Sequence, residues 1–328
     1  MNRNELLYIR LSFFISVLIC AAKFIAWLYT HSLVIFSDAL ESVINVAGAA
    51  FAWYSIYLAG KPRDEDHPYG HGKIEFFSVG FEGGMIFIAG ISILIQAILF
   101  FIHPKQVEQL QAGIWLSVAA GAANFLLGYF LLMKGKQRNS ITLQGNGHHI
   151  LSDGYTSLGV IVALLLILFT GVKWIDPLAS VVAGSLLIYT GSKLVRRAIR
   201  GLMDEVDVNV IDDIITILKE NRKNNWIDVH NLRAQRYGNN YHVDCHVTLP
   251  YYFLLEQVHD EIKRMDEALN SNFKKGSIEF FIHTDPCLEV SCGHCLIADC
   301  AVRKKAFVKK IEWSRDNLLP NKKHEYSD

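Results

Sequence analysis

Residues 33–59 read LVIFSDALESVINVAGAAFAWYSIYLA, a long apolar run that carries Asp38, Glu41 and Asn45 in its first half. The run is long enough to cross a bilayer, because a helical span needs roughly 20 apolar residues. Positions 38, 41 and 45 are spaced i, i+3 and i+7, so they share about one face of a helix. A charged group at membrane depth costs roughly 2.5–3.5 kcal/mol on insertion scales and usually lines a pathway. The stretch therefore predicts a membrane-spanning helix with one polar face.

Similar apolar stretches recur along the first two thirds of the chain. Five more meet or approach the length of a span: 7–29, 77–102, 112–133, 148–171 and 175–195. The first of these is too long for the core of a cleavable signal peptide. Later residues have an ordinary soluble composition, although 51% of the whole chain is hydrophobic. We expect six transmembrane helices within 1–202, a small soluble domain over 203–287 and a tail over 288–328.

Basic residues are distributed unequally between the two sides of the predicted bundle. The loops on one side carry only Lys105 and Lys173. The ends and loops on the other side are richer, with Arg3, Arg10, Lys61, Arg63, Lys73, Lys134, Lys136, Arg138, Lys193, Arg196, Arg197 and Arg200. An excess of Lys and Arg marks the cytoplasmic side. We therefore expect a multi-pass protein of the cell (inner) membrane with both termini in the cytoplasm.

The fifth stretch carries a second polar pair. His149 and Asp153 are four residues apart, as are Glu41 and Asn45 in the second stretch, and such residues share a helix face. Two facing helices would then bring four nitrogen and oxygen ligands around one point. That set suits zinc, and iron, cobalt or manganese could use the same ligand types. The alternative is two pairs of helix-end polar residues bonded to backbone or water.

The loop after the second stretch reads DEDHPYGHGK over residues 64–73. With the polar pairs of the second and fifth stretches, it resembles the cation diffusion facilitators, most closely their bacterial iron/zinc efflux branch. The resemblance implies a loop metal site at Asp64, His67 and His71. Read without it, this segment is a polar loop in which one aspartate and two histidines could share an ion.

The transport motif departs from the family's pattern in the second stretch. The resemblance implies a transport site at Glu41, Asn45, His149 and Asp153, where relatives usually have Asp or His and then Asp in the second span. Asparagine offers a neutral carbonyl oxygen and takes up no proton. Our hypothesis is that Asp38 or Glu41 supplies the titratable carboxylate, which makes Asp38 a further candidate ligand.

The soluble region has the order α-β-β-α-β. Its expected elements are a helix over 208–223, strands at 229–236 and 241–249, a helix over 253–272 and a strand at 277–283. This order predicts a small open sheet with helices on one face. The resemblance implies a cytoplasmic ferredoxin-like dimerisation domain.

Several residues of this region match metal-binding positions of the relatives. The matching positions are His230, His246, His259, His283 and Asp285. Lys73 and Asp204 match a charged interlock between subunits. Without the resemblance, the histidines would read as surface residues and the two charges as solvated side chains.

Four of the six cysteines lie in the tail or directly before it, at Cys287, Cys292, Cys295 and Cys300, with His294 among them. In a reducing cytoplasm such spacing more often binds metal than forms disulfides. Four thiolates, or three with His294, could hold a structural zinc ion; an iron–sulfur cluster and free thiols remain alternatives.

The residues and the resemblance together predict an antiporter that exchanges zinc or another divalent transition metal for protons, and the resemblance implies a homodimer. No ATP-binding loop is present, and no His-Glu-x-x-His motif supports an intramembrane metallohydrolase. The net charge is zero and no basic tract occurs, so we expect no nucleic-acid partner. The alternative function is a metal sensor or scaffold that has lost transport.

Overall fold

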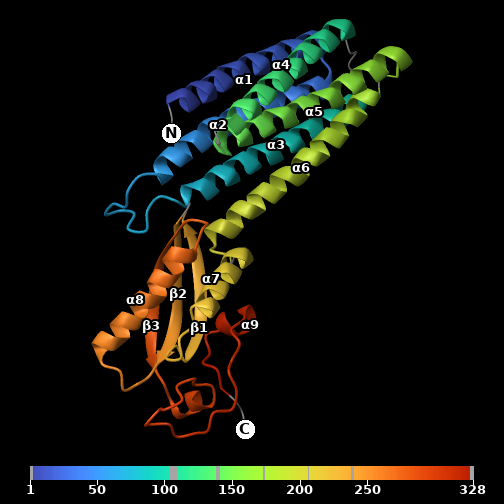
Figure 1. Ribbon diagram of the computed structural model, residues 1–328. Coiled ribbons are helices and arrows are strands. Elements are labelled where there is room, and N and C mark those ends of the chain that lie inside the picture. Colours follow the sequence, from blue (N-terminus) through green and yellow to red (C-terminus); the bar gives the residue numbers. More distant parts are fainter. Residues whose placement is uncertain are drawn as a thin grey trace. The chain divides into compact units, whose positions relative to one another are not determined.

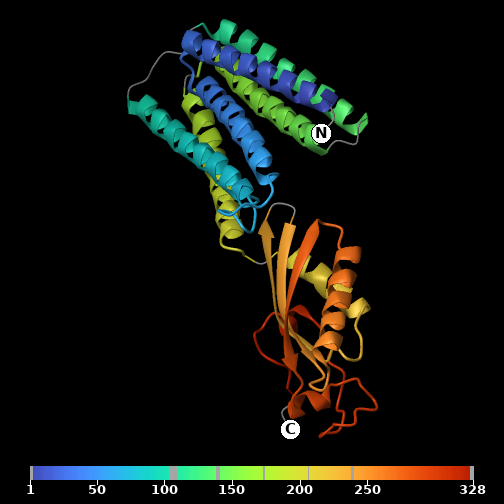
Figure 2. The same ribbon diagram turned by 90° about the vertical axis from the view of Figure 1, so that its left-hand side faces the viewer.

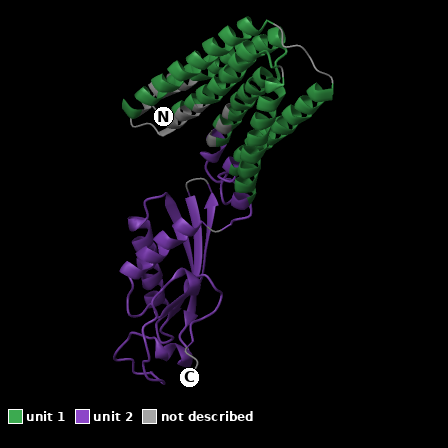
Figure 3. Cartoon of the chain, turned by 90° about the vertical axis from the view of Figure 1, so that its right-hand side faces the viewer, with its two compact units in different colours: residues 1–55, 76–199 green, residues 56–75, 200–328 purple. Residues whose placement is uncertain are grey.

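The computed structural model describes residues 3–102, 109–137, 141–172, 174–205, 207–237 and 240–325. Within its helices the side chains of several residues, His148 and His149 among them, lie outside the described part. The chain divides into two compact units (Figure 3), one formed by residues 1–55 and 76–199 and the other by residues 56–75 and 200–328.

Six helices of the described chain are long and apolar enough to cross a membrane, which confirms the predicted spans. They are α1 (Arg3–Thr30), α2 (Leu33–Ala59), α3 (Ile74–Ile102), α4 (Leu110–Gln137), α5 (Ile141–Thr170) and α6 (Ile175–Leu202), and all are labelled in Figure 1. Many of their large apolar side chains, such as Phe14, Trp115 and Phe169, are exposed. Lipid tails are the solvent that such a surface requires.

The start of α2 is fixed by a carboxylate from α6. Asp176 is fully buried, and it accepts hydrogen bonds from the Leu33 N–H at 2.7 Å and the Val34 N–H at 3.3 Å. The hydroxyl of Ser32 donates to the same carboxylate at 2.5 Å. The first N–H groups of a helix have no partner within it, and a negative charge there is favourable. Asp176 therefore holds α2, with its polar face, against the first turn of α6.

Helices α1, α4 and α5 lie side by side, and α3 lies beside α6 (Figures 1 and 2). Glycines allow the close approaches. A Cβ atom added to Gly83 of α3 would meet the Leu194 Cβ of α6 at 2.7 Å, and one on Gly191 would meet the Phe87 nitrogen at 2.6 Å. Small residues of this kind let helix backbones touch within a bilayer.

The second unit contains the predicted α-β-β-α-β order. Its elements are α7 (Val208–Glu220), β1 (Asp228–Tyr237), β2 (Asn240–Leu249), α8 (Leu255–Asn272) and β3 (Ser277–Pro286). The sheet order is β1-β2-β3, with β1 antiparallel to β2 and β2 parallel to β3. The parallel pairing follows from α8, which carries the chain back along the sheet. Figure 2 shows both helices on the same side of the sheet.

Alternation along the strands separates an apolar face from a polar one. On β2, Tyr241, Val243 and Cys245 pack into the core with residues of α7 and α8. The intervening His242 and His246 point to the other face, because successive side chains of a strand alternate. The helix-free face of the sheet thus carries the histidines.

The tail packs on this same domain with little regular structure of its own. Among its described residues it forms a short 3₁₀ helix at Glu289–Gly293 and the single turn α9 (Arg315–Leu318). Trp313 and Leu318 are 1% and 0% exposed and belong to the domain core. The guanidinium of Arg222 lies 4.0 Å from the centre of the Trp313 ring.

Candidate metal transport site and cytoplasmic metal clusters

The second and fifth spans meet through a pair of predicted transport-site residues. The side-chain amide of Asn45 on α2 donates to the Asp153 carboxylate on α5 at 3.0 Å. Both side chains are partly buried in an otherwise apolar bundle. The side chain of His149, one helical turn before Asp153, lies outside the described residues.

Glu41 lies one turn from Asn45 on the same face of α2. Its carboxylate is within electrostatic range of Asp153, Asp38 and Lys23. The structure therefore brings Glu41, Asn45 and Asp153 into one region between the two helices. Two carboxylates and an amide oxygen are hard oxygen donors for a divalent cation, and one imidazole would complete a four-ligand set.

Asp38 has a different partner. Its carboxylate accepts a hydrogen bond from the Lys23 ammonium on α1 at 2.8 Å, and both side chains are only 3% exposed. The Ser157 hydroxyl donates to the same carboxylate at 3.1 Å. A buried carboxylate held by a lysine and a hydroxyl is already compensated. This geometry favours Asp38 as the counter-ion of Lys23 rather than as a metal ligand.

Our sequence analysis missed Lys23 and Glu82, two ionisable residues inside apolar spans. Glu82 of α3 lies against α2, where a Cβ atom on Gly48 would be 3.2 Å from the Glu82 Cγ. Gly48 follows Asn45 by three residues, so Glu82 is close to the same face of α2. An ionisable residue inside a span is a functional candidate. A search of each span for such residues would have found both Lys23 and Glu82.

The loop residues predicted to bind metal do lie together. Ligand atoms of Asp64, His67 and His71 are all within 4.8 Å of one another. His67 Nδ1 is 3.0 Å from one oxygen of Asp64, and His71 Nε2 is 3.3 Å from the other. The hydrogen bond from His67 lowers the pKa of Asp64 below its ordinary value. This donor set fits zinc or a related divalent ion.

The loop is tied to the sheet on both sides of this cluster. Arg63 makes two hydrogen bonds to Glu279 of β3, at 2.5 and 3.2 Å. Lys73 donates to Asp204 at 3.0 Å and lies 4.9 Å from the centre of the Tyr237 ring. Lys73 and Asp204, which were predicted to form an interlock between subunits, are paired here within one chain. Asp204 has a φ of +55°, a left-handed conformation that aspartate tolerates better than most residues.

A second cluster lies on the helix-free face of the sheet. Ligand atoms of His230, His246 and Asp285 are within 4.8 Å of one another. Asp285 Oδ2 lies 3.5 Å from His230 Nε2 and 3.4 Å from His246 Nδ1, yet it accepts no hydrogen bond from the described residues. Three inward-facing donors at this spacing leave room for an ion between them, so these residues fit a metal.

His230 also has an outer partner of the kind that metal-binding histidines use. Its Nδ1 faces Asp228 at 3.6 Å, and His324 of the tail contacts the same carboxylate. Burial opposes ionisation of Asp228, but its contacts with His230 and His324 outweigh burial and keep its pKa below the ordinary value. A carboxylate behind a ligating imidazole fixes the orientation of the ring.

The other two predicted ligands in the domain differ in position. The His283 ring lies 4.6 Å from the His246 ring, so it borders the cluster. His259 is exposed on α8 and lines a surface groove with Asp266 and Asn270, away from the three-ligand group. Sequence reasoning missed Lys323, whose ammonium lies 3.5 Å from Asp285 Oδ2.

The four tail cysteines all line one cavity at the end of the domain. None of the six cysteines forms a disulfide. His294, their alternative partner, is fully buried beside His324, with the two ring centres 6.4 Å apart.

Comparison with known proteins agrees with this architecture. Residues 9–203 match the family model of the cation efflux transmembrane domain, and residues 206–287 match that of the cation efflux protein cytoplasmic domain. An uncharacterised transporter of Synechocystis is 35% identical over 244 residues, which cover 74% of this chain and 79% of the relative.

Two relatives from Bacillus carry names that state their substrates. The manganese efflux system protein MneP of Bacillus subtilis is 25% identical over 84% of this chain and 93% of its own length. A cadmium, cobalt and zinc/H(+)-K(+) antiporter of Bacillus velezensis is 29% identical over 58% of this chain and 61% of its own. With both of its domains matched, the chain belongs to the cation efflux family of membrane transporters, the cation diffusion facilitators, and is not an enzyme.

Proposed function

We propose that this chain exports divalent transition-metal ions from the cytoplasm in exchange for protons, with zinc as the principal substrate. The observation that carries the proposal is the meeting of Asn45 and Asp153 across α2 and α5, beside Glu41. In this proposal His149 completes the ligand set. A mixed nitrogen and oxygen set favours zinc, as in the iron/zinc branch that the motifs resemble, while iron, cobalt and manganese accept similar ligands.

Proton exchange follows from competition at the same ligands. Imidazole and carboxylate groups must be deprotonated to bind a metal, so a bound ion and bound protons exclude one another. Asn45 takes up no proton and Asp38 is paired with Lys23, so Glu41, Asp153 and His149 are the proposed proton carriers. The name of the Bacillus velezensis relative, a cadmium, cobalt and zinc/H(+)-K(+) antiporter, supports the exchange of metal for protons.

We further propose that the chain forms a homodimer in the cell (inner) membrane, with both termini in the cytoplasm. The match of residues 206–287 to the cytoplasmic domain of cation efflux proteins supports this. Its helix-free sheet face carries the His230, His246 and Asp285 cluster, which a second copy could cover. In this arrangement Lys73 and Asp204 would take part in the charged interlock between subunits that the resemblance implies. Their pairing within one chain, at 3.0 Å, is compatible with that role.

The test is metal-driven uptake into proteoliposomes with an imposed pH gradient, comparing zinc, iron, cobalt, manganese and cadmium. Asp153→Ala should abolish uptake, while Asp260→Ala, which removes an exposed carboxylate on α8, should leave it unchanged. Zinc should be the fastest ion, and collapsing the pH gradient should slow it. A wild-type protein that binds these ions but transports none of them would replace this proposal with that of a metal sensor.

A further inference from the structure

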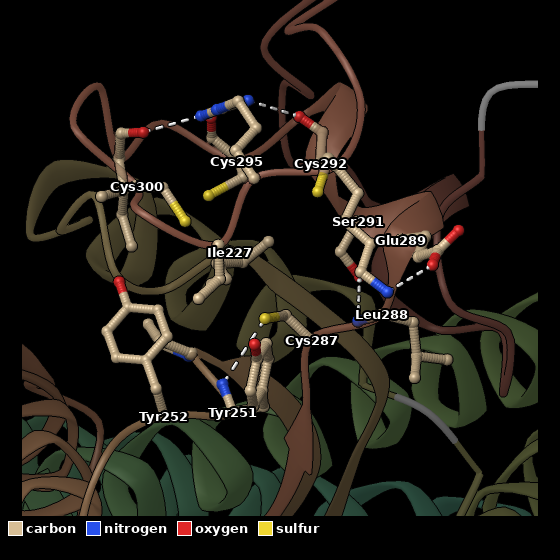
Figure 4. A pocket seen from close by; sticks show the side chains of 15 residues that line it. Ile227, Tyr251, Tyr252, Cys287, Leu288, Glu289, Ser291, Cys292, Cys295 and Cys300 are labelled. Atoms are coloured by element: carbon tan, nitrogen blue, oxygen red, sulfur yellow. Dashed lines mark hydrogen bonds and ion pairs between the residues drawn. The ribbon is translucent and has the colours of Figure 1, made fainter.

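The tail cysteines form a group that the transport mechanism does not use. Cys287, Cys292, Cys295 and Cys300 line one cavity of about 300 Å³. Figure 4 shows their sulfur atoms turned toward this space, with Ile227, Tyr251 and Tyr252 lining it as well. The two remaining cysteines are elsewhere: Cys20 lies in α1, and Cys245 is in the core of the sheet.

The cysteines have a hydrogen-bond donor and cationic side chains near them. The backbone N–H of Tyr251 points at the Cys287 sulfur, 3.5 Å away. Arg303 and Lys304 line the same cavity, where Lys304 is paired with Glu289 at 2.7 Å. A divalent ion bound by four thiolates carries a net double negative charge, which nearby N–H groups and cations stabilise.

Arg303 also fixes the loop that presents three of the cysteines. Its guanidinium donates to the carbonyl oxygens of Cys292 at 2.9 Å, Cys295 at 3.1 Å and Ile297 at 2.6 Å. These contacts hold the C-x-x-C turn in place, as a preformed ligand loop requires. They also give Arg303 a structural role in this loop.

The geometry selects the all-cysteine set over three cysteines with His294. His294 does not line the cavity; it is fully buried beside His324. Among the described residues, only histidine and aspartate groups have three ligand atoms within 4.8 Å of one another, so the four sulfurs are more widely spaced. Binding one ion requires the sulfurs to come closer together, and other staggered χ1 rotamers offer each sulfur a different position on the same backbone.

The tail has little regular structure to stabilise it. Between Pro286 and His324 its regular structure consists of one 3₁₀ turn and the four-residue α9. Small segments with so little secondary structure usually depend on a disulfide or a metal. A tetrahedral zinc ion supplies that stability without redox chemistry, and its sites are commonly built around a C-x₂-C pair.

We propose that Cys287, Cys292, Cys295 and Cys300 bind one structural zinc ion through four thiolates, which anchors the tail to the cytoplasmic domain. The site is separate from the transport pathway, because its cysteines all lie in the second unit of the chain and α2 and α5 contribute none of them. It holds a permanent ion rather than cargo. The proposal therefore stands or falls independently of the proposed transport function.

The first experiment counts zinc in the purified full chain after dialysis against a weak chelator. The background variant Asp153→Ala, His71→Ala and His246→Ala removes the nitrogen and oxygen sites. In that background we expect one zinc ion per chain, lost in Cys292→Ser/Cys295→Ser and retained in Cys20→Ser. Cobalt loaded in place of zinc should give a thiolate-to-cobalt charge-transfer band that the double variant lacks.

A second measurement needs no cysteine variant. Zinc should protect four of the six thiols of the unsubstituted chain from alkylation, and a strong chelator should expose them. Removal of zinc by the chelator should also speed hydrogen exchange over residues 287–325. Iron with acid-labile sulfide in place of zinc, disulfides within the tail, or equal zinc content with and without the cysteines would each overturn the proposal.

Discussion

At the scale of single residues, the Lys23–Asp38 pair sets two opposite charges in the interior of a membrane bundle. Each is only 3% exposed, so neither can be solvated by water if the other is removed. Breaking a buried ion pair leaves an uncompensated charge and costs about 3–5 kcal/mol. Replacing both partners removes the charges together and is far less destabilising.

We therefore predict that Lys23→Met and Asp38→Asn each destabilise the transporter severely, whereas the double variant recovers most of the stability. Thermal unfolding in detergent measures this, with metal uptake measured on the same preparations. Uptake by the double variant would show that Asp38 is no ligand. A double variant that is stable but inactive would restore Asp38 to the transport site.

Glu261 gives a pH-dependent contribution to the cytoplasmic domain. It is 4% exposed, and its carboxylate accepts a hydrogen bond from the Trp226 indole at 2.8 Å. Burial opposes its ionisation, but Trp226, Asn225 and Arg264 outweigh burial and lower its pKa. A lowered pKa stabilises the fold above the unfolded value of about 4.3, and this contribution is lost as the pH falls through the folded value.

Glu261→Gln should consequently cost about 1.5–3 kcal/mol at pH 7, the usual range for hydrogen bonds to a charged group. The loss should shrink toward zero as the pH falls through the lowered pKa of the folded state, because the wild-type carboxylate becomes protonated there as well. Urea unfolding of the full chain, followed by hydrogen exchange in α8 and β1, checks both values. An effect of equal size at pH 7 and below that pKa would assign the role of Glu261 to packing.

Single residues show which features of the candidate site could be predicted from the sequence. The spacing of Glu41 and Asn45 predicted their shared face, but their meeting with Asp153 depends on how α2 packs on α5. Lys23 was missed because the apolar residues around it keep the mean hydropathy of the span high despite one charge. The position of His259 could not be derived, because the side of the sheet that α8 covers is a tertiary property.

At the scale of elements, the contact between α3 and α6 depends on glycine. A Cβ atom at Gly83 would lie 2.7 Å from the Leu194 Cβ and 2.9 Å from the Val195 nitrogen, whereas at Gly84 it would meet nothing within 4 Å. Neighbouring glycines on one helix therefore form a matched pair, one inside the contact and one outside it.

We predict that Gly83→Ala destabilises the bundle by about 1–3 kcal/mol, because an overpacked contact must separate the helices. Gly84→Ala should be neutral or stabilise by up to about 1 kcal/mol, since alanine is the better helix former. Unfolding temperatures of both variants in the same detergent provide the measurement. Equal losses for the two would show that helix propensity, rather than the approach of α6, decides the outcome.

Hydropathy predicted some helix boundaries and missed others. The second span was predicted at 33–59 and observed at Leu33–Ala59. Its start is fixed by Asp176, which accepts hydrogen bonds from Ser32 and from the first N–H groups of the helix. The fifth was predicted from 148, yet α5 begins at Ile141. The first turns of α5 are polar. A search for apolar stretches therefore misses the part of the helix that extends beyond the hydrocarbon core of the bilayer.

At the scale of the whole molecule, the chain separates candidate cargo ligands from candidate resident ones. The pair Asn45 and Asp153 lies in the first unit, whereas both groups of clustered histidines and aspartates lie in the second. A metal in the membrane must leave for transport to occur. A metal in the second unit can remain bound throughout the cycle.

We predict that His71→Ala and His246→Ala each lower the metal stoichiometry of the purified chain but leave zinc uptake at saturating metal within about threefold of wild type. Asp153→Ala should instead abolish uptake and leave binding at the other sites. Isothermal titration and vesicle uptake on the same preparations test the separation. Complete loss of uptake in His71→Ala would place the loop in the translocation pathway.

Lys323 has a consequence for the charge balance of the sheet cluster. Its ammonium lies 3.5 Å from the Asp285 oxygen that faces His230 and His246. An ion entering between these three side chains meets a positive charge already at its anionic ligand, and like charges at this range repel. If a divalent cation bound between His230, His246 and Asp285 and displaced the Lys323 ammonium, the net charge of the cluster would rise by one unit instead of two.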